Sequence, residues 1–150
     1  MDKQQIFAQM LKVWNTDIAF NRHLGLKVTK MEQDHAQIEF DWQANLIGNP
    51  ITKTLHGGVT AAVLDMAGGV VAAANMLSRL PVTDKTTITK KLARLSTIDF
   101  RTDFLRPGRG NHFIATARII RHGSKIAVTR MELHNEKGEH IAFGTGTYMV

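Results

Sequence analysis

A long apolar segment with a single acidic residue constrains the fold of this chain more than any other feature. From Val59 to Leu77 the only charged side chain is Asp65, and the segment opens with His56-Gly57-Gly58. A helix that is apolar on all sides is normally buried in a protein core. We therefore predict a central core helix from Gly57 to about Ser78.

The start of this predicted helix and its acidic residue each offer a chemical function. The first N–H groups of a helix have no partner within the helix, and the helix dipole there favours negative charge. Glycines let another group approach, so Gly57 and Gly58 can form an oxyanion-binding end. A lone buried carboxylate is costly, which makes Asp65 a candidate acid or base. The residues leave one alternative open, an ordinary helix start with a core Asp bonded to a neighbouring hydroxyl.

The spacing of these two features carries a prediction about assembly. Gly58 and Asp65 share a helix face but lie about 10.5 Å apart along the axis, so one reacting carbonyl cannot contact both. If they cooperate, Asp65 of one subunit meets the glycine end of an antiparallel helix from another subunit. The spacing therefore predicts an active site shared across a two-fold homodimer.

The remaining residues predict a sheet around this helix. Apolar spacing predicts an N-terminal helical segment over residues 1–24, with a second short helix capped by Asp17 and ended by Gly25. Alternation and turn signals predict six strands, at Leu26–Met31, His35–Trp42, Thr97–Leu105, His112–Arg121, Lys125–Asn135 and His140–Met149. The stretch Thr83–Leu95 is expected to be a polar, basic connection. This order predicts an α+β fold in a single domain, 1–150, with one antiparallel sheet curled around one helix.

The composition excludes several classes of protein. The chain has no cysteine, so it has no disulfide, thiolate metal site or cysteine nucleophile, and it suits a reducing compartment. The N-terminal residues lack a signal peptide's apolar region, and the segment around Asp65 is rich in Ala and Gly. We therefore expect a cytoplasmic protein without a membrane span. The seven histidines lack ligand spacing, so we expect no metal site.

The formal net charge of +6 indicates anionic partners. The basic residues form no stripe and do not alternate with aromatic residues, so nucleic acid is not expected. Two local groups stand out, Lys85 with Lys90, Lys91 and Arg94, and Arg101 with Arg106 and Arg109. They are either an ordinary solvated surface or a landing site for the phosphates of a small polyanionic ligand.

Several segments together resemble a known family. They are His56-Gly57-Gly58 with Asp65 nine positions after the histidine, Thr97-Ile98-Asp99-Phe100, Phe104-Leu105-Arg106-Pro107-Gly108-Arg109-Gly110 and Ala142-Phe143-Gly144-Thr145-Gly146-Thr147-Tyr148. The chain resembles the hotdog-fold acyl-CoA thioesterases of the phenylacetyl-CoA (PaaI-like) type, and most of all the YigI-type medium- and long-chain subgroup. The resemblance implies a sheet wrapped around one central helix, and homodimers with a continuous sheet, commonly paired into homotetramers. It also implies hydrolysis of acyl-CoA to CoA and a free fatty or aryl acid, with no metal or organic cofactor.

The resemblance also implies roles for individual residues. The backbone N–H of Gly57 or Gly58 would polarise the thioester carbonyl, and Asp65 from the other subunit would be the nucleophile or general base. The Thr97 hydroxyl would lie near Asp65, and His56 would order the loop before the helix.

Asn49 would position water or the carbonyl by the same resemblance. Here the chain departs from the family, because Asn49 stands seven rather than six residues before the histidine, and Lys53 occupies the region where glycine is usual. For the CoA phosphates we select four basic residues, Arg106, Arg109, Lys90 and Lys91.

Two other functions remain open on the same fold. A non-catalytic acyl-CoA sensor would keep an apolar pocket but would not need Asp65, and release of free thiol distinguishes it from an enzyme. A hotdog enoyl-CoA hydratase or dehydratase would use a carboxylate with a histidine in a different arrangement, and crotonyl-CoA would reveal that activity.

Overall fold

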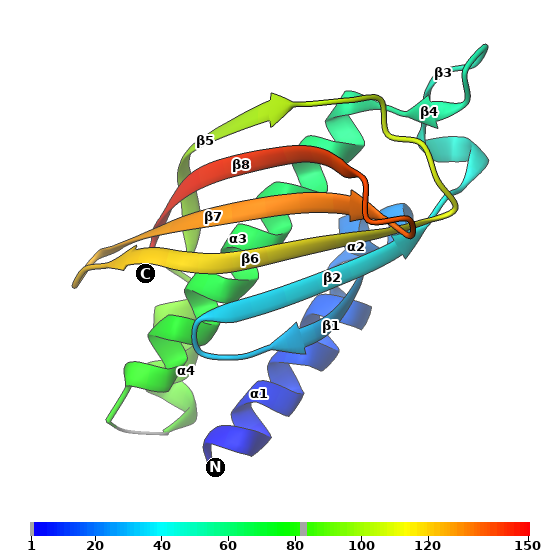
Figure 1. Ribbon diagram of the computed structural model, residues 1–150. Coiled ribbons are helices and arrows are strands. Elements are labelled where there is room, and N and C mark those ends of the chain that lie inside the picture. Colours follow the sequence, from blue (N-terminus) through cyan, green and yellow to red (C-terminus); the bar gives the residue numbers. More distant parts are fainter. Residues whose placement is uncertain (1, 82–83) are drawn as a thin grey trace.

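A six-stranded antiparallel sheet curves around one long helix in the computed structural model of the chain, which describes residues 2–81 and 84–150. The helix is α3 (Gly57–Arg79), and it lies against the concave side of the sheet (Figure 1). This confirms the predicted α+β plan and the hotdog arrangement.

The strands run in the spatial order β1-β2-β6-β7-β8-β5. Their bounds are β1 (Lys27–Met31), β2 (His35–Asp41), β5 (Ser96–Phe104), β6 (His112–His122), β7 (Ile126–Asn135) and β8 (His140–Met149). Each lies within one residue of its predicted range, because alternation and turn residues are local signals. The strand β5 is the first strand after α3 in the chain and forms one edge of the sheet.

The core lies between α3 and the inner face of the sheet. Alternate residues of β2, such as Ile38 and Phe40, are buried, as are Val63, Leu64 and Ala67 on α3. Burying a large aliphatic or aromatic side chain contributes about 1.5–3 kcal/mol, so these layers hold the helix in place. The apolar length of α3 would suffice to cross a membrane, but this is the buried core helix.

The N-terminal segment differs in one detail from the prediction. Helix α1 (Lys3–Lys12) continues into a π-helical turn, η1 (Val13–Asp17), before α2 (Ala19–Leu24). Asp17 is therefore not the cap of α2: its carboxylate accepts a hydrogen bond from the Thr16 hydroxyl, 2.8 Å away, and α2 begins without a side-chain cap. The predicted stop is confirmed, since Gly25 has the left-handed φ of 71° that glycine favours. Met1 of the predicted segment lies outside the described residues.

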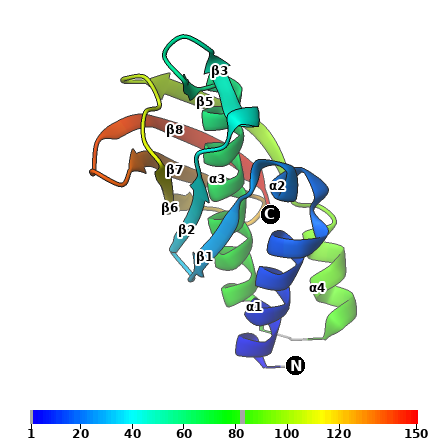
Figure 2. The same ribbon diagram turned by 90° about the vertical axis from the view of Figure 1, so that its right-hand side faces the viewer.

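The basic connection after α3 contains a helix that we did not predict, α4 (Lys85–Leu92). Asp84 caps it by accepting a hydrogen bond from the Thr87 N–H at 2.9 Å, and Ile88 is its buried anchor. Figure 2 shows α4 and α1 near the C-terminal end of α3, on the side away from the sheet. Thr83, the first residue of the predicted connection, lies outside the described residues.

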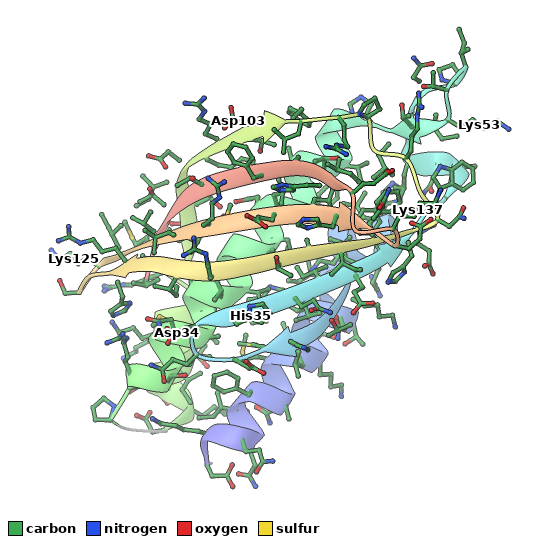
Figure 3. The ribbon with its side chains drawn as sticks, in the orientation of Figure 1. Asp34, His35, Lys53, Asp103, Lys125 and Lys137 are labelled. Carbon is green, nitrogen blue, oxygen red and sulfur yellow. The ribbon has the colours of Figure 1, made fainter. Side chains whose placement is uncertain are left out.

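A small hairpin also went unpredicted, at the start of α3. A 3₁₀ turn, η2 (Ala44–Leu46), leads into β3 (Ile47–Asn49) and β4 (Thr54–Leu55). Lys53, near its tip, has a φ of 55° (Figure 3). This is the left-handed conformation that glycine adopts most easily, so the backbone here keeps a glycine-like shape although the residue is lysine.

Candidate active site

The carboxylate of Asp65 projects from the third turn of α3 and is held by two hydroxyl groups. Its Oδ1 accepts a hydrogen bond from Thr97 Oγ1, on β5, at 3.0 Å. The buried hydroxyl of Tyr148, on β8, lies 3.0 Å from both Oδ1 and the backbone oxygen of Asp65. Three elements distant in the sequence thus meet at one carboxylate.

Asp65 is half-buried. It opens onto a small hollow of about 150 Å³ that Trp14, Met66 and Leu95 also line. Within residues 2–81 and 84–150 no ion pair involves Asp65, and no donor contacts its second oxygen, Oδ2. A carboxylate with a free oxygen beside an apolar hollow can accept a proton or attack an electrophile.

The glycine end of α3 is held by His56. The His56 Nδ1 accepts a hydrogen bond from the Gly58 N–H at 2.8 Å, and the backbone N–H of His56 donates to the Leu46 carbonyl at 2.8 Å. The N–H of Gly58 is therefore already used. The exposed Gly57 N–H has no acceptor in the described part of the chain. Of the two predicted donors, Gly57 is the one available to a ligand.

The side chain of Asn49 is engaged in its own hairpin. Its Oδ1 accepts hydrogen bonds from the N–H groups of Ile51 at 2.9 Å and Thr52 at 3.3 Å. This is the local turn bonding that asparagine often provides. The hairpin lies next to the glycine end, but a role of Asn49 in positioning water or substrate stays a prediction.

The edge strand β5 connects the two halves of the site. Its second residue, Thr97, lies beside Asp65, and its last residue, Phe104, lies beside the glycine end. A Cβ atom built on Gly57 would lie 3.5 Å from the Phe104 ring. The strand exposes large apolar side chains, with Ile98 at 48% and Phe104 at 56%. An edge strand of this kind is open to pairing with another strand.

The four predicted phosphate-binding residues fall into two separate groups. Arg106 and Arg109 are exposed in the loop after β5. This loop packs against the glycine end, because the Leu55 N–H donates to the Gly108 carbonyl at 3.0 Å. Arg109 also lines a hollow of about 380 Å³ together with Lys53.

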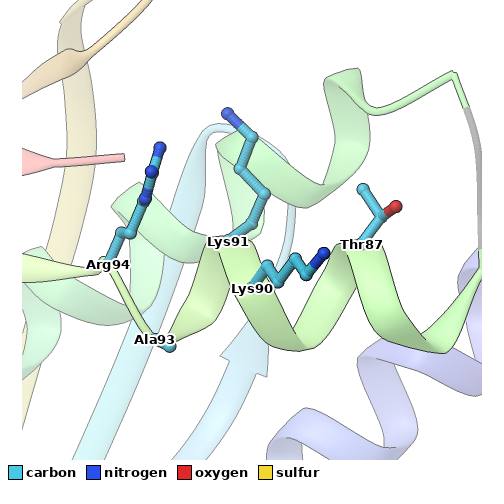
Figure 4. A pocket seen from close by; sticks show the side chains of 5 residues that line it. All are labelled: Thr87, Lys90, Lys91, Ala93 and Arg94. Atoms are coloured by element: carbon cyan, nitrogen blue, oxygen red, sulfur yellow. The ribbon is translucent and has the colours of Figure 1, made fainter.

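Lys90 and Lys91 belong to the second group, on α4. With Thr87, Ala93 and Arg94 they line an open groove of about 470 Å³ (Figure 4). The chain passes from Arg94 into β5, so this group adjoins the Asp65 half of the site, whereas the two loop arginines adjoin the Gly57 half.

Sequence reasoning missed Tyr148 as a site residue. It is the only tyrosine of the chain and lies in the closing motif that carries the family resemblance. Burial, and then the nearby Asp65 carboxylate, raise the pKa of its phenol well above the ordinary value, so the phenol stays protonated. A lone tyrosine that follows two alternating glycines, Gly144 and Gly146, was the available signal, but its contact with α3 required the fold.

A cluster of possible metal ligands lies elsewhere, on the sheet face turned away from α3. Donor atoms of Glu132, His134 and His140 lie within 4.8 Å of one another. The two imidazole rings stack at 4.4 Å with only 10° between their planes. Their lone pairs therefore lie in two nearly parallel planes, whereas a shared metal ion needs them to point at one position. The arrangement fits aromatic stacking better than metal binding.

Residues 52–142 match the family model of the thioesterase superfamily. The chain belongs to the thioesterase superfamily. The medium/long-chain acyl-CoA thioesterase YigI of Salmonella typhimurium is 47% identical over 131 residues, 87% of this chain and 84% of that protein. The protein of the same name from Escherichia coli strain K12 is 45% identical over the same shares. A crystal structure from Shewanella oneidensis, described as related to the thioesterase superfamily, is also similar to this thioesterase-superfamily chain. It has a TM-score of 0.95 and 42% identity, covering 99% of this chain and 97% of that one.

Proposed function

We propose that this thioesterase-superfamily chain hydrolyses medium- and long-chain acyl-CoA thioesters to the free acid and CoA. The relatives named for that activity support the substrate class, at 45–47% identity over most of the chain. The observation that carries the proposal is the Asp65 carboxylate, which has one oxygen held by hydroxyls and the other free beside an apolar hollow.

The active site is proposed to form between two subunits. Gly57 and Asp65 lie eight residues apart on α3, about 12 Å along the axis. The strand β5 carries Asp65's partner Thr97 at one end and Gly57's neighbour Phe104 at the other. If two β5 edges pair antiparallel across a two-fold axis, the Thr97 end of one meets the Phe104 end of the other. Each Asp65 then approaches the Gly57 end of the other subunit, giving two sites per homodimer.

In the proposed reaction the thioester oxygen accepts a hydrogen bond from the Gly57 N–H. One such donor is worth about 3 kcal/mol in the transition state of an acyl transfer. Asp65 acts as general base or as nucleophile. As a base it takes a proton from water, the water oxygen bonds to the acyl carbon, and the C–S bond breaks. The CoA thiolate is a comparatively stable leaving group and takes up a proton from solvent, and Asp65 releases its proton to solvent, which restores the carboxylate.

The two basic groups fit a shared site. The subunit that supplies Gly57 brings Arg106 and Arg109, and the subunit that supplies Asp65 brings Lys90 and Lys91. We propose that both groups contact CoA phosphates, since charge-assisted contacts to phosphate are strong. We further propose that the enzyme works without a cofactor or metal and that residues 1–150 form one domain. Its homodimers would pair into tetramers, and the protein would act in the cytoplasm.

The test is a panel of CoA esters from acetyl to palmitoyl, together with phenylacetyl-CoA, with trapping of released thiol. We expect the highest kcat/KM on the medium and long chains. If the esters bind but none releases thiol, the chain is an acyl-CoA sensor instead. Loss of the enoyl absorbance of crotonyl-CoA without thiol release would identify a hydratase.

A further inference from the structure

We propose that Tyr148 is a positioning residue that fixes the Asp65 carboxylate for catalysis. The inference rests on the proposed function and extends it to a residue that does not touch the substrate. Tyr148 is 1% exposed, and its hydroxyl lies 3.0 Å from Asp65 Oδ1 and 3.0 Å from the Asp65 backbone oxygen. One phenol thus ties the carboxylate to its own helix.

Two glycines, Gly68 and Gly146, leave room for this phenol because they have no side chain. A Cβ atom on Gly68, in α3, would overlap the phenol oxygen and lie 2.7 Å from Cζ. A Cβ atom on Gly146, in β8, would lie 2.7 Å from the phenol oxygen. Real Cβ atoms do not approach other atoms so closely, so both positions must lack a side chain while Tyr148 keeps this orientation.

The hydrogen bond has a defined direction. The phenol stays protonated, because burial and the neighbouring carboxylate both raise its pKa. Its one proton is therefore donated between Oδ1 and the Asp65 backbone oxygen, which are equally close, while Thr97 also donates to Oδ1. Two donors on one oxygen restrict rotation of the carboxylate and leave Oδ2 directed away from them, available to take a proton or attack carbon.

The first test compares Tyr148→Phe with Asp65→Asn. Tyr148→Phe keeps the ring but removes the donor, so we expect kcat to fall about 10- to 100-fold with KM within about twofold of wild type. If Asp65→Asn is inactive but folded Tyr148→Phe keeps the wild-type kcat, only the Tyr148 proposal is overturned. If Asp65→Asn keeps wild-type turnover, the proposed function's catalytic carboxylate and this inference both fail.

A matched pair of glycines provides the second test and does not depend on Tyr148→Phe folding. Because Tyr148 is the only tyrosine, fluorotyrosine incorporation gives a single fluorine NMR resonance from this phenol. Gly68→Ala should move that resonance and lower kcat. Gly69→Ala should leave it in place, since a Cβ there would lie 3.8 Å from the ring. Asp65→Ala should also move the resonance. A resonance unmoved by both Gly68→Ala and Asp65→Ala contradicts the contact.

Discussion

Two regions of α3, the glycine at its N-terminus and the carboxylate two turns later, serve opposite chemical demands. At the N-terminus, Gly57 is exposed, carries no side chain, and presents an N–H group without an acceptor in the described chain. Two turns later Asp65 is half-buried and held by hydroxyls from two strands. The Gly57 N–H can donate a hydrogen bond to an oxygen, whereas the Asp65 carboxylate can accept a proton or attack a carbon atom.

On the proposed mechanism, neither half is a complete catalytic site. The halves are separated by about 12 Å of rigid helix, so a conformational change within one subunit cannot bring them to the same carbonyl. The exposed edge β5 runs from one half to the other, with apolar residues at both ends. On the proposed mechanism, the helix separates the two functions and pairing of subunits joins them.

The largest expected effect is at the acidic half. Asp65→Asn preserves shape and one oxygen but removes the base, so turnover should fall at least about 100-fold with little change in substrate binding. Steady-state thiol release and a binding titration check this together. Wild-type turnover in the folded variant would remove Asp65 from the mechanism.

A loss of about 100-fold is also expected at the glycine half, from Gly57→Pro. Proline deletes the donor N–H and is well tolerated at the first position of a helix. Its preceding residue, His56, already has the extended conformation that proline requires (φ −61°, ψ 135°). Gly57→Ala is the matched control, since it keeps the N–H and its Cβ would only touch Phe104 at 3.5 Å. Equal activity of the proline and alanine variants would exclude the Gly57 N–H as an oxyanion donor.

A smaller effect is expected from the basic groups beside each half. Arg106→Gln with Arg109→Gln should raise KM roughly five- to tenfold for CoA esters but not for the corresponding pantetheine thioesters, which lack the nucleotide phosphates. Lys90→Gln with Lys91→Gln should do the same if both subunits contribute to one CoA site. If KM rises equally for the CoA esters and the pantetheine thioesters, these residues do not bind the nucleotide phosphates and only maintain the local structure of the loop and of α4.

The smallest effect is expected outside the proposed catalytic and phosphate-binding groups, at His112 on β6. Its ring contacts Asp41 at 2.8 Å and Glu39 at 2.7 Å, and these carboxylates raise the pKa of His112 above its ordinary value of 6.5. The hydrogen bonds from Gln37 and then His112 lower the pKa of Glu39 below 4.5. Because the pKa of His112 is raised in the folded protein, protonated His112 stabilises the fold at low pH, and this stabilisation is lost as the pH rises through the raised pKa. Because the pKa of Glu39 is lowered, its ionised carboxylate stabilises the fold above pH 4.5, and this stabilisation is lost as the pH falls through the lowered pKa.

The contribution of His112 is therefore complete between about pH 4.5 and 6.5 and absent in alkaline buffer. His112→Gln should destabilise the protein by less than about 1 kcal/mol, because the cluster is partly exposed. Thermal unfolding at about pH 5.5 and pH 9 measures the difference, and kcat per folded protein should not change. A loss of stability that is larger at alkaline pH would contradict the assigned sign.

The same two regions show what the sequence could predict. The apolar helix, its single carboxylate and its glycine start were all recognisable, because they depend on local pattern. The choice between Gly57 and Gly58 was not, since it depends on which N–H the His56 ring accepts. Tyr148 was missed because its contact with Asp65 joins residues 83 positions apart.

Local capping accounts for the errors in the fold. Asp17 looked like a helix cap, but a π-helical turn carried the chain past it. The helix α4 was overlooked because eight mostly polar residues with one buried anchor, Ile88, give a weak helical pattern. Its cap, Asp84, was the signal that could have revealed it.

Complementation between two inactive variants tests the shared site most directly. Asp65→Asn and Gly57→Pro homodimers should both be inactive. In a purified heterodimer one site combines an intact Gly57 with an intact Asp65, so roughly half of the wild-type kcat per dimer should return, while the other site carries both defects. A heterodimer of verified composition that stays as inactive as its parents would contradict the account, because it would mean that the two groups do not meet across the subunit boundary.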